Sequence, residues 1–155
     1  MSSDRRPPLP GSSRDARPNI GILLRLPFQA VVQRVSAGLA AAGFDDIRPA
    51  HTAVFQHVEA DGSRLTDLAE RAQISKQSMG YLVDHLEQRG YLERRPDPTD
   101  RRAALVCLTE RGWEEVSAAL AIIAALEAEW TRALGRHRMR QLRELLAELA
   151  QVARS

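Results

Sequence analysis

The residues best suited to chemistry are concentrated between positions 75 and 102, and most of them are hydrogen-bond donors or positively charged. The segment "SKQS" spans residues 75–78, and "RRPDPTDRR" at 94–102 sets two arginine pairs around two prolines and two aspartates. Such side chains are suited to phosphates and to the edges of bases. This combination indicates recognition of a nucleic acid.

Catalytic and metal-binding patterns are absent from the sequence. There is no G-x-S-x-G, no H-E-x-x-H and no glycine-rich phosphate loop. His51 and His57 are six residues apart and do not share a helix face, so we expect no metal site and no cofactor. Cys107, the single cysteine, lies on a predicted strand and is interpreted as a small buried hydrophobic residue. We therefore expect a protein that is not an enzyme, in a reducing cytoplasm.

Apolar periodicity predicts a mainly helical chain with one small hairpin. Thr66, Ser75 and Thr109 are predicted helix caps, and Gly43, Gly90 and Gly135 are predicted helix ends. Two apolar stretches, one around Leu92 and one at 103–108, are predicted to pair as a β-hairpin. The predicted helices cover residues 20–42, 49–60, 66–71, 75–90, 113–134 and 138–152.

The predicted helix at 75–90 divides into an apolar stripe and a polar face. The stripe comprises Met79, Leu82, Val83 and Leu86. The opposite face begins with Ser75, Lys76, Gln77 and Ser78 and continues to Tyr81, and its acids follow only at Asp84 and Glu87. A short helix, a tight turn, a second helix and a hairpin make a winged helix-turn-helix, whose second helix reads the major groove. Taken alone, the segment could also be a solvated helix start.

Size and charge restrict the function less than the motifs do. The 155 residues fit one domain, and 22 Lys and Arg against 20 Asp and Glu give a net charge of +2. Residues 1–18 are predicted to be a flexible Arg-, Ser- and Pro-rich tail, which by itself accounts for that excess. No apolar run approaches the roughly 18 residues that a membrane span requires. DNA binding must therefore depend on where the charges lie.

The stretch "LTDLAERAQISKQSMGYLVDHLEQRGYLERRPDPTDRRAALVCLTERG" resembles the core of the MarR family of bacterial transcription regulators. "DPTDRR" followed by "LTERG" is the most specific part of the match, together with "LVDHLEQRGYLERR". The resemblance extends over about residues 20–152. It implies a single domain at 19–155, with a DNA-binding lobe at 48–112 and dimerisation helices at 19–45 and 113–155.

The resemblance also assigns roles to the hairpin, which is the wing of this fold. It implies that Arg102 enters the minor groove and that Asp100 braces its side chain, with Arg101 beside it. Physical reasoning agrees, because a narrow minor groove attracts guanidinium groups. Either Asp97 or Asp100 should brace an arginine, since both would otherwise repel phosphate. The alternative is a solvated loop whose charges neutralise one another.

Other candidate contacts are less specific. Thr66 and Arg95 are candidates for phosphate contacts, and strand alternation predicts that only one of Arg94 and Arg95 faces outward. The resemblance further implies a small aromatic ligand between the dimerisation helices and the lobe. Its candidate lining residues, which ordinary core packing would also explain, are Phe28, His51, Phe55 and Trp113.

Together these observations predict a regulator that binds specific double-stranded DNA. We expect a homodimeric repressor on an inverted-repeat operator, released by a small aromatic or phenolic effector. A winged-helix module that binds another protein and no DNA is the alternative.

Overall fold

The computed structural model describes residues 17–154, so most of the predicted N-terminal tail lies outside the described residues. The order of the helices and strands confirms a mainly helical fold with a small antiparallel sheet. The elements are α1 (Ile20–Ala41), the 3-10 helix η1 (Pro49–His51), α2 (Thr52–Phe55), β1 (Ser63–Arg64), α3 (Leu65–Arg71), α4 (Lys76–Gln88), β2 (Leu92–Asp97), β3 (Asp100–Leu108), α5 (Glu110–Leu134) and α6 (Arg136–Val152).

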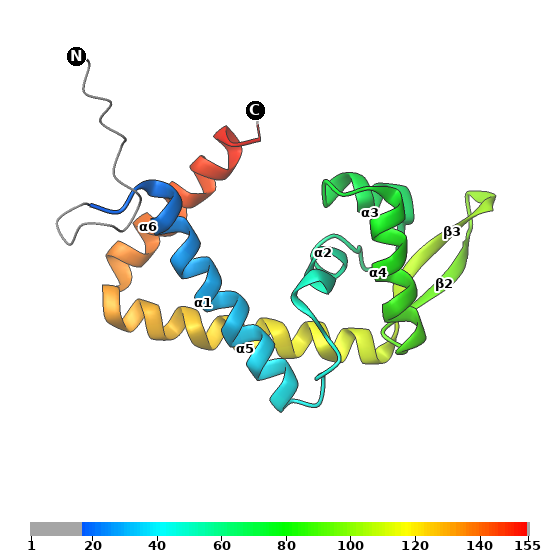
Figure 1. Cartoon of the computed structure of the whole chain (residues 1–155), viewed down its shortest axis with the longest axis horizontal. Helices are drawn as coiled ribbons and strands as arrows, with labels where there is room; N and C mark the ends of the chain where they lie inside the picture. Colours follow the sequence, from blue (N-terminus) through cyan, green and yellow to red (C-terminus); the bar gives the residue numbers. More distant parts are fainter. Residues whose placement is uncertain (1–16, 155) are drawn as a thin grey trace, which may run out of the picture.

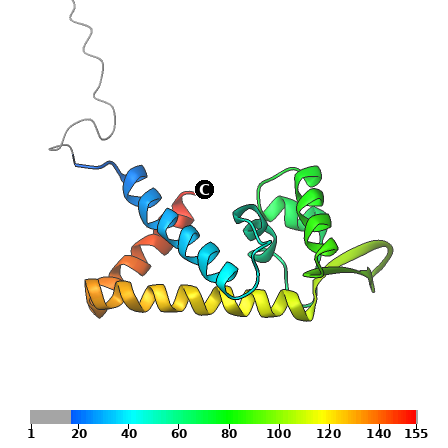
Figure 2. The ribbon, with the colours of Figure 1, turned by 60° about the horizontal axis from the view of Figure 1, so that its bottom comes forward.

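Helix α5 connects the two ends of the molecule. Figure 2 shows it running along the base, with the lobe that contains α2, α3, α4 and the hairpin at one end and α6 at the other. Helix α1 crosses α5, and α6 folds back beside α1 (Figure 1). The crossing is close because Gly38 lacks a side chain: a Cβ at this position would lie 2.6 Å from Cδ1 of Ile122. A bidentate contact between Arg34 and Glu129 also joins α1 to α5.

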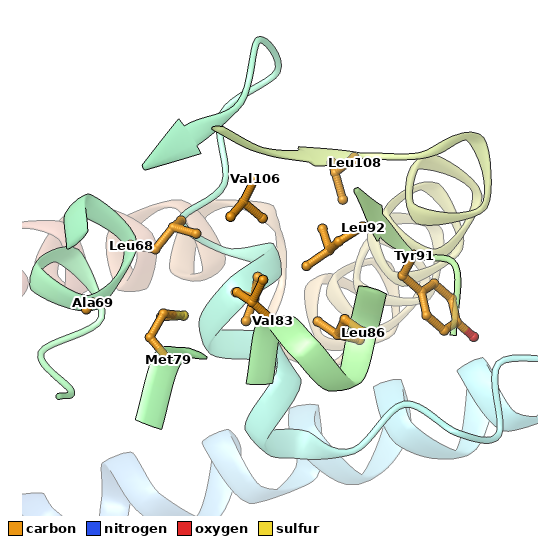
Figure 3. Packing of buried hydrophobic residues seen from close by; sticks show 10 residues of the cluster. Leu68, Ala69, Met79, Val83, Leu86, Tyr91, Leu92, Val106 and Leu108 are labelled. Carbon is orange, nitrogen blue, oxygen red and sulfur yellow. The ribbon is translucent and has the colours of Figure 1, made fainter. Parts of the chain in front are cut away.

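The hydrophobic core lies inside the lobe (Figure 3). Helix α3, helix α4 and the sheet each contribute one apolar face, and these faces exclude water where they meet. The predicted stripe of α4 is confirmed, since Met79, Val83 and Leu86 are buried and Leu82 packs against them. The other buried members of this cluster are Val54, Leu68, Ala69, Tyr91, Leu92, Val106 and Leu108.

Helix α4 begins and ends as its sequence predicts. The Ser75 side chain accepts a hydrogen bond from the Ser78 amide at 3.0 Å. Gly90 follows the helix with φ of 76°, a left-handed conformation that glycine adopts without steric cost. The turn before α4 places Gln73 at φ of 55°, and Gln73 is the one non-glycine residue within 17–154 with a positive φ. These two turns fix the direction of α4 relative to α3 and the sheet.

Two predicted helix starts and ends were wrong. Thr66 is not a cap, because α3 begins at Leu65 and Arg64 is its N-cap residue. The helix predicted at 49–60 is instead η1 followed by α2, which ends at Phe55. Beyond α2, the backbone amide of Glu59 donates a hydrogen bond to the Ser63 hydroxyl at 3.0 Å. This local side-chain bond takes a donor that a longer helix would use.

The sheet is larger than the predicted hairpin. It has three strands in the order β1-β3-β2, and both neighbouring pairs are antiparallel. Sequence reasoning missed β1, which is two residues long and pairs Ser63 with Val106. Strand β3 begins at Asp100 rather than at residue 103, and a register irregularity between Pro96 and Asp97 precedes the turn. Most of the "RRPDPTDRR" segment is therefore strand.

Helices α1 and α6 leave large apolar side chains uncovered. Helix α6 has no buried residue in the single chain. Its exposed apolar residues are Leu142, Leu145, Leu146, Leu149 and Val152, and those of α1 are Ile20, Leu23, Leu24, Leu26 and Phe28. Within residues 17–154, no helix is both long and apolar enough to cross a membrane.

Two glycines provide a test of the packing that joins α5 to the lobe. A Cβ at Gly112 would overlap the Tyr91 carbonyl oxygen and lie 3.0 Å from Leu108. We expect Gly112→Ala to lower the free energy of unfolding by about 1–3 kcal/mol in chemical denaturation, as overpacking does.

The control is Gly80→Ala in α4, where the nearest atom to a new Cβ is 3.9 Å away. Its stability should be unchanged or higher by about 0.5–1 kcal/mol, because alanine favours helix. Equal destabilisation by the two substitutions would contradict this account of the packing.

Candidate nucleic-acid interface

The start of α4 presents a continuous polar surface. Ser75, Lys76, Gln77 and Ser78 are all exposed, as is Tyr81 one turn later. Tyr81 is 67% exposed, which is unusual for so large a ring, and its hydroxyl lies 3.3 Å from Nε2 of Gln77. Burial of the opposite face in the core directs these side chains outward. The donors predicted from the sequence therefore lie together on one helix end.

The acids further along α4 are neutralised from the sheet. Arg94 on β2 pairs with Asp84 at 2.6 Å and also with Glu87. This arginine therefore binds the side of α4 and connects the helix to the wing. Arg95, its neighbour on β2, pairs with Glu93 on its own strand, and neither arginine is buried. That only one of the two contacts phosphate stays a prediction.

The wing arginines lie just beyond the turn formed by Pro98 and Thr99. Arg101 and Arg102 are consecutive residues of β3, so they point to opposite faces, and both are exposed. Asp100 accepts a hydrogen bond from the backbone amide of Arg102 at 3.0 Å. The brace implied by the family resemblance therefore acts here on the main chain of Arg102 and not on its guanidinium.

The buried acid of the wing is Asp97, which is 5% exposed. Its Oδ2 accepts a hydrogen bond from Nε of Arg64 at 2.8 Å, and its Oδ1 accepts the amide and the hydroxyl of Thr99. The bonds from Thr99, followed by that from Arg64, lower the pKa of Asp97 to about 2. Asp97 is therefore charged throughout the physiological range and holds the turn closed.

The ion pairs leave three cations of α4 and the wing tip without a partner. Across residues 17–154, no carboxylate lies within ion-pair distance of Lys76, Arg101 or Arg102. Asp84, Glu87, Asp97 and Glu93, by contrast, each pair with an arginine. The surface formed by α4 and the wing is therefore positive locally, although the chain is almost neutral.

A polar cluster behind α4 joins the lobe to the long helices. The Tyr91 hydroxyl donates to Asp46 at 2.6 Å and accepts from Arg111 of α5 at 3.0 Å. Burial, and then the bond to Asp46, raise the pKa of Tyr91. Nearby, the rings of His51 and His85 stack with their centroids 4.7 Å apart.

The stacked histidines add a dependence on pH. Burial, and then the neighbouring His85, lower the pKa of His51 to about 4, and burial also lowers the pKa of His85. As the pH falls from about 6.5 toward 4, the unfolded chain binds protons that the folded lobe excludes. The stability contributed by neutral His51 is therefore lost across that acidic window.

The four candidate ligand-lining residues come from four different elements, namely α1, η1, α2 and α5. Phe28 is 66% exposed on α1, His51 is buried beneath α4, and Phe55 packs edge-on against Tyr91. None of the four, Trp113 included, lines either of the two hollows found, which lie among α1, α5 and α6. Residues 17–154 also contain no group of three or more potential metal ligands.

Cys107 is buried, as its place on a strand predicts, and burial raises the pKa of its thiol. The thiol is therefore kept protonated and away from solvent, which fits the prediction of a small hydrophobic residue.

The comparisons with known proteins agree with this geometry. The MarR family profile matches residues 45–103, the stretch from the start of the lobe to the wing arginines. The chain is 30% identical over 109 residues to the HTH-type transcriptional regulator YdcH of Bacillus subtilis, covering 69% of this chain and 74% of YdcH. It is 27% identical over 132 residues to the repressor MdtR of the same bacterium, covering 84% of this chain and 85% of MdtR.

The chain belongs to the MarR family. It is a DNA-binding transcriptional regulator with a winged helix-turn-helix. Among solved structures, the repressor CouR bound to a 23-mer DNA duplex is 27% identical with a TM-score of 0.69, covering 85% of this chain and 92% of CouR. CouR of Rhodococcus jostii RHA1 bound to p-coumaroyl-CoA matches over the same shares at 28% identity and a TM-score of 0.67.

Sequence reasoning missed several residues that position this surface. Arg64 binds a carboxylate 33 residues away, and no local pattern predicts that pairing. The contact of Arg94 with α4 was missed for the same reason. Asp97 did carry a signal, because an aspartate two residues before a threonine in a proline-containing turn is typical of a side chain that bonds the turn backbone.

Glu115 on α5 allows a test of stability against pH. It is buried without a partner for Oε2, and burial raises its pKa to about 7. Between pH 4.5 and 7 the unfolded chain releases a proton that the folded chain keeps, so stability is lost as the pH rises. We expect Glu115→Gln to raise the free energy of unfolding by about 1–3 kcal/mol at pH 8 and to have little effect at pH 4.

The exposed neighbour Glu114 provides the matched control. Glu114→Gln should leave the urea denaturation curves unchanged at both pH values. If Glu115→Gln raised the free energy of unfolding equally at pH 4 and pH 8, the stabilisation would not come from titration of the Glu115 carboxyl group.

Proposed function

We propose that this regulator is a homodimeric repressor that binds an inverted-repeat operator, with the start of α4 in the major groove and the wing in the adjacent minor groove. The observation that carries the proposal is the cluster of exposed donors and unpaired cations on one end of α4 and on the wing. A two-fold dimer would present two such surfaces, with half-sites about one helical turn, roughly 10 bp, apart.

The proposed major-groove residues are Ser75, Lys76, Gln77, Ser78 and Tyr81. Gln77 can read the adenine edge and Lys76 the guanine edge or a phosphate, since each reaches outward from the first turn of the helix. Tyr81 offers an exposed ring and a hydroxyl one turn later. Ion pairing of Asp84 and Glu87 with Arg94 supports the geometry, because it reduces the repulsion between these acids and the phosphates.

The proposed wing contacts are Arg101 and Arg102, with Asp100 fixing the backbone between them. Their exposure and lack of carboxylate partners support insertion of a guanidinium into a narrow minor groove. Because the two side chains point to opposite faces of β3, we propose that one enters the groove and the other contacts its phosphate edge. The family resemblance assigns the groove to Arg102. Arg95 remains a candidate for phosphate, provided it releases Glu93, and Thr66 is a weaker one.

The exposed apolar faces of α1 and α6 support dimerisation through these helices. Each face carries five large exposed apolar residues. Single exposed apolar residues are common on protein surfaces, but groups of this size mark interaction sites. Two hollows between α1, α5 and α6, of about 200 and 390 Å³, share Trp130 and Leu142. We propose that side chains of a second copy fill them.

An effector is the remaining part of the proposal. The CouR structure with p-coumaroyl-CoA supports release of the repressor by a small aromatic or aromatic acyl ligand. Neither hollow between α1, α5 and α6 is lined by Phe28, His51, Phe55 or Trp113. We therefore propose that any effector site forms between the lobe and the dimerisation helices when the ligand binds.

Substitution of the wing arginine tests DNA binding. Arg102→Ala should weaken binding to a duplex selected by the wild-type protein from a random pool by about 1–3 kcal/mol, measured by fluorescence anisotropy. Loss of a cation from the groove is the physical reason, and the melting temperature should not change.

Arg138→Ala on α6 is the charge-matched control, because Arg138 is exposed and far from the wing along the chain. It should bind within about twofold of the wild type. Wild-type affinity of Arg102→Ala would contradict the wing model. If the unaltered protein retards no duplex, even at low salt, the alternative of a protein-interaction module gains support.

A charge in the α6 face tests the dimer. Leu145 is 63% exposed in the single chain, and we expect Leu145→Glu to shift sedimentation from dimer toward monomer because a carboxylate would be buried without a partner. Removal of residues 136–155 should abolish the dimer.

Ala147→Glu is the control, because Ala147 is exposed on the opposite side of the same helix. It should remain a dimer. A stable dimer of Leu145→Glu and of the truncated chain would exclude α6 from the interface.

A further inference from the structure

The contact between Arg64 and Asp97 connects the wing tip to the start of α3. Arg64 is the last residue of β1 and the N-cap residue of α3, and Asp97 ends β2. Nη2 of Arg64 lies 2.6 Å from Oδ2 of Asp97, 3.5 Å from Thr99 Oγ1 and 3.9 Å from Oδ2 of Asp100. One guanidinium therefore reaches all three polar side chains around the turn.

We propose that Arg64 and Asp97 form a clasp that positions the wing for DNA binding, so that both are positioning residues rather than groove readers. The proposal rests on the function proposed above and adds two residues to it. Without the clasp, the tip would keep the local bonds of Asp97 and Asp100 within the turn and the β2–β3 ladder, whose register is already irregular at Pro96 and Asp97, but no contact with the start of α3. With the clasp, an ion pair joins the tip to the start of α3, the first helix of the helix-turn-helix.

The geometry also explains why a DNA-binding tip contains two acids. Asp97 is buried and saturated by hydrogen bonds from Arg64 and Thr99, so its charge does not face the phosphates. Asp100 lies within 3.9 Å of the same guanidinium and accepts the Arg102 amide. Arg64 thus offsets the acids while Asp97 fixes the strand that carries Arg101 and Arg102. Deleting either partner should displace the same arginines.

A double-mutant cycle separates a clasp from a direct phosphate contact. Arg64→Gln, Asp97→Asn and the double variant are titrated with the duplex selected by the wild-type protein. We expect each single variant to bind on the order of tenfold more weakly, and the double variant to be no weaker than either. Asp97→Asn is decisive, because removing a negative charge should strengthen DNA binding if the charge acts only through electrostatics.

Arg71→Gln is the matched control, because it removes the same charge from the same lobe by breaking the exposed pair with Glu59. Its affinity should remain within about twofold of the wild type. Weaker binding by Arg64→Gln with wild-type or tighter binding by Asp97→Asn would overturn the clasp and make Arg64 a phosphate contact.

Hydrogen exchange without DNA provides a readout that does not depend on the proposed function. Amides of residues 99–102 should exchange faster in both single variants, whereas those of Val83 and Leu86 in α4 should not change. Unchanged exchange at the tip would overturn the clasp even if DNA binding fell. If the wild-type protein bound no duplex, the proposed function would fail, and the exchange comparison would still decide whether the clasp exists.

Discussion

The structure depends on burial of one face of α4 against the sheet and α3. Met79, Val83 and Leu86 are fully buried, with Leu68 and Val106 packed around them. Because a helix repeats every 3.6 residues, fixing this face also fixes the direction of Lys76, Gln77 and Tyr81. The hydrophobic core of the lobe therefore positions the proposed DNA-binding surface. Substitutions in the core should alter recognition without touching a base.

Ion pairs determine how the charges of a nearly neutral chain become a positive surface. Arg94 neutralises Asp84 and Glu87, and Arg64 neutralises Asp97, so three acids near the proposed DNA surface are offset. Surface pairs add little stability of their own. Their more important effect here is geometric, because each joins two elements: α4 to β2, and the wing tip to the start of α3. Lys76, Arg101 and Arg102 remain available for phosphate and bases.

The lobe is joined to the long helices mainly through α5. Gly112 allows α5 to pack directly on the Tyr91 backbone, and the Tyr91–Asp46–Arg111 contacts join the lobe to α5 and to the loop that follows α1. Glu115, whose Oε2 has no hydrogen-bond partner, lies on α5, and the stacked His51 and His85 lie on η1 and α4, so their titration affects the stability of the lobe and of its joint with α5.

The sequence by itself determined the mainly helical fold, the stripe of α4, its Ser75 cap and its Gly90 end, because these depend on periodicity and on local backbone preferences. The tertiary structure alone decided the rest. Strand β1 and the ion pairs of Arg64 and Arg94 depend on contacts between distant segments. Asp97 combines both kinds of contact. Its hydrogen bonds to the turn are local, but its ion pair is with Arg64, which is 33 residues away in the sequence. Spacing along the chain fixes which side of a helix a residue occupies, but only packing decides which partner it meets.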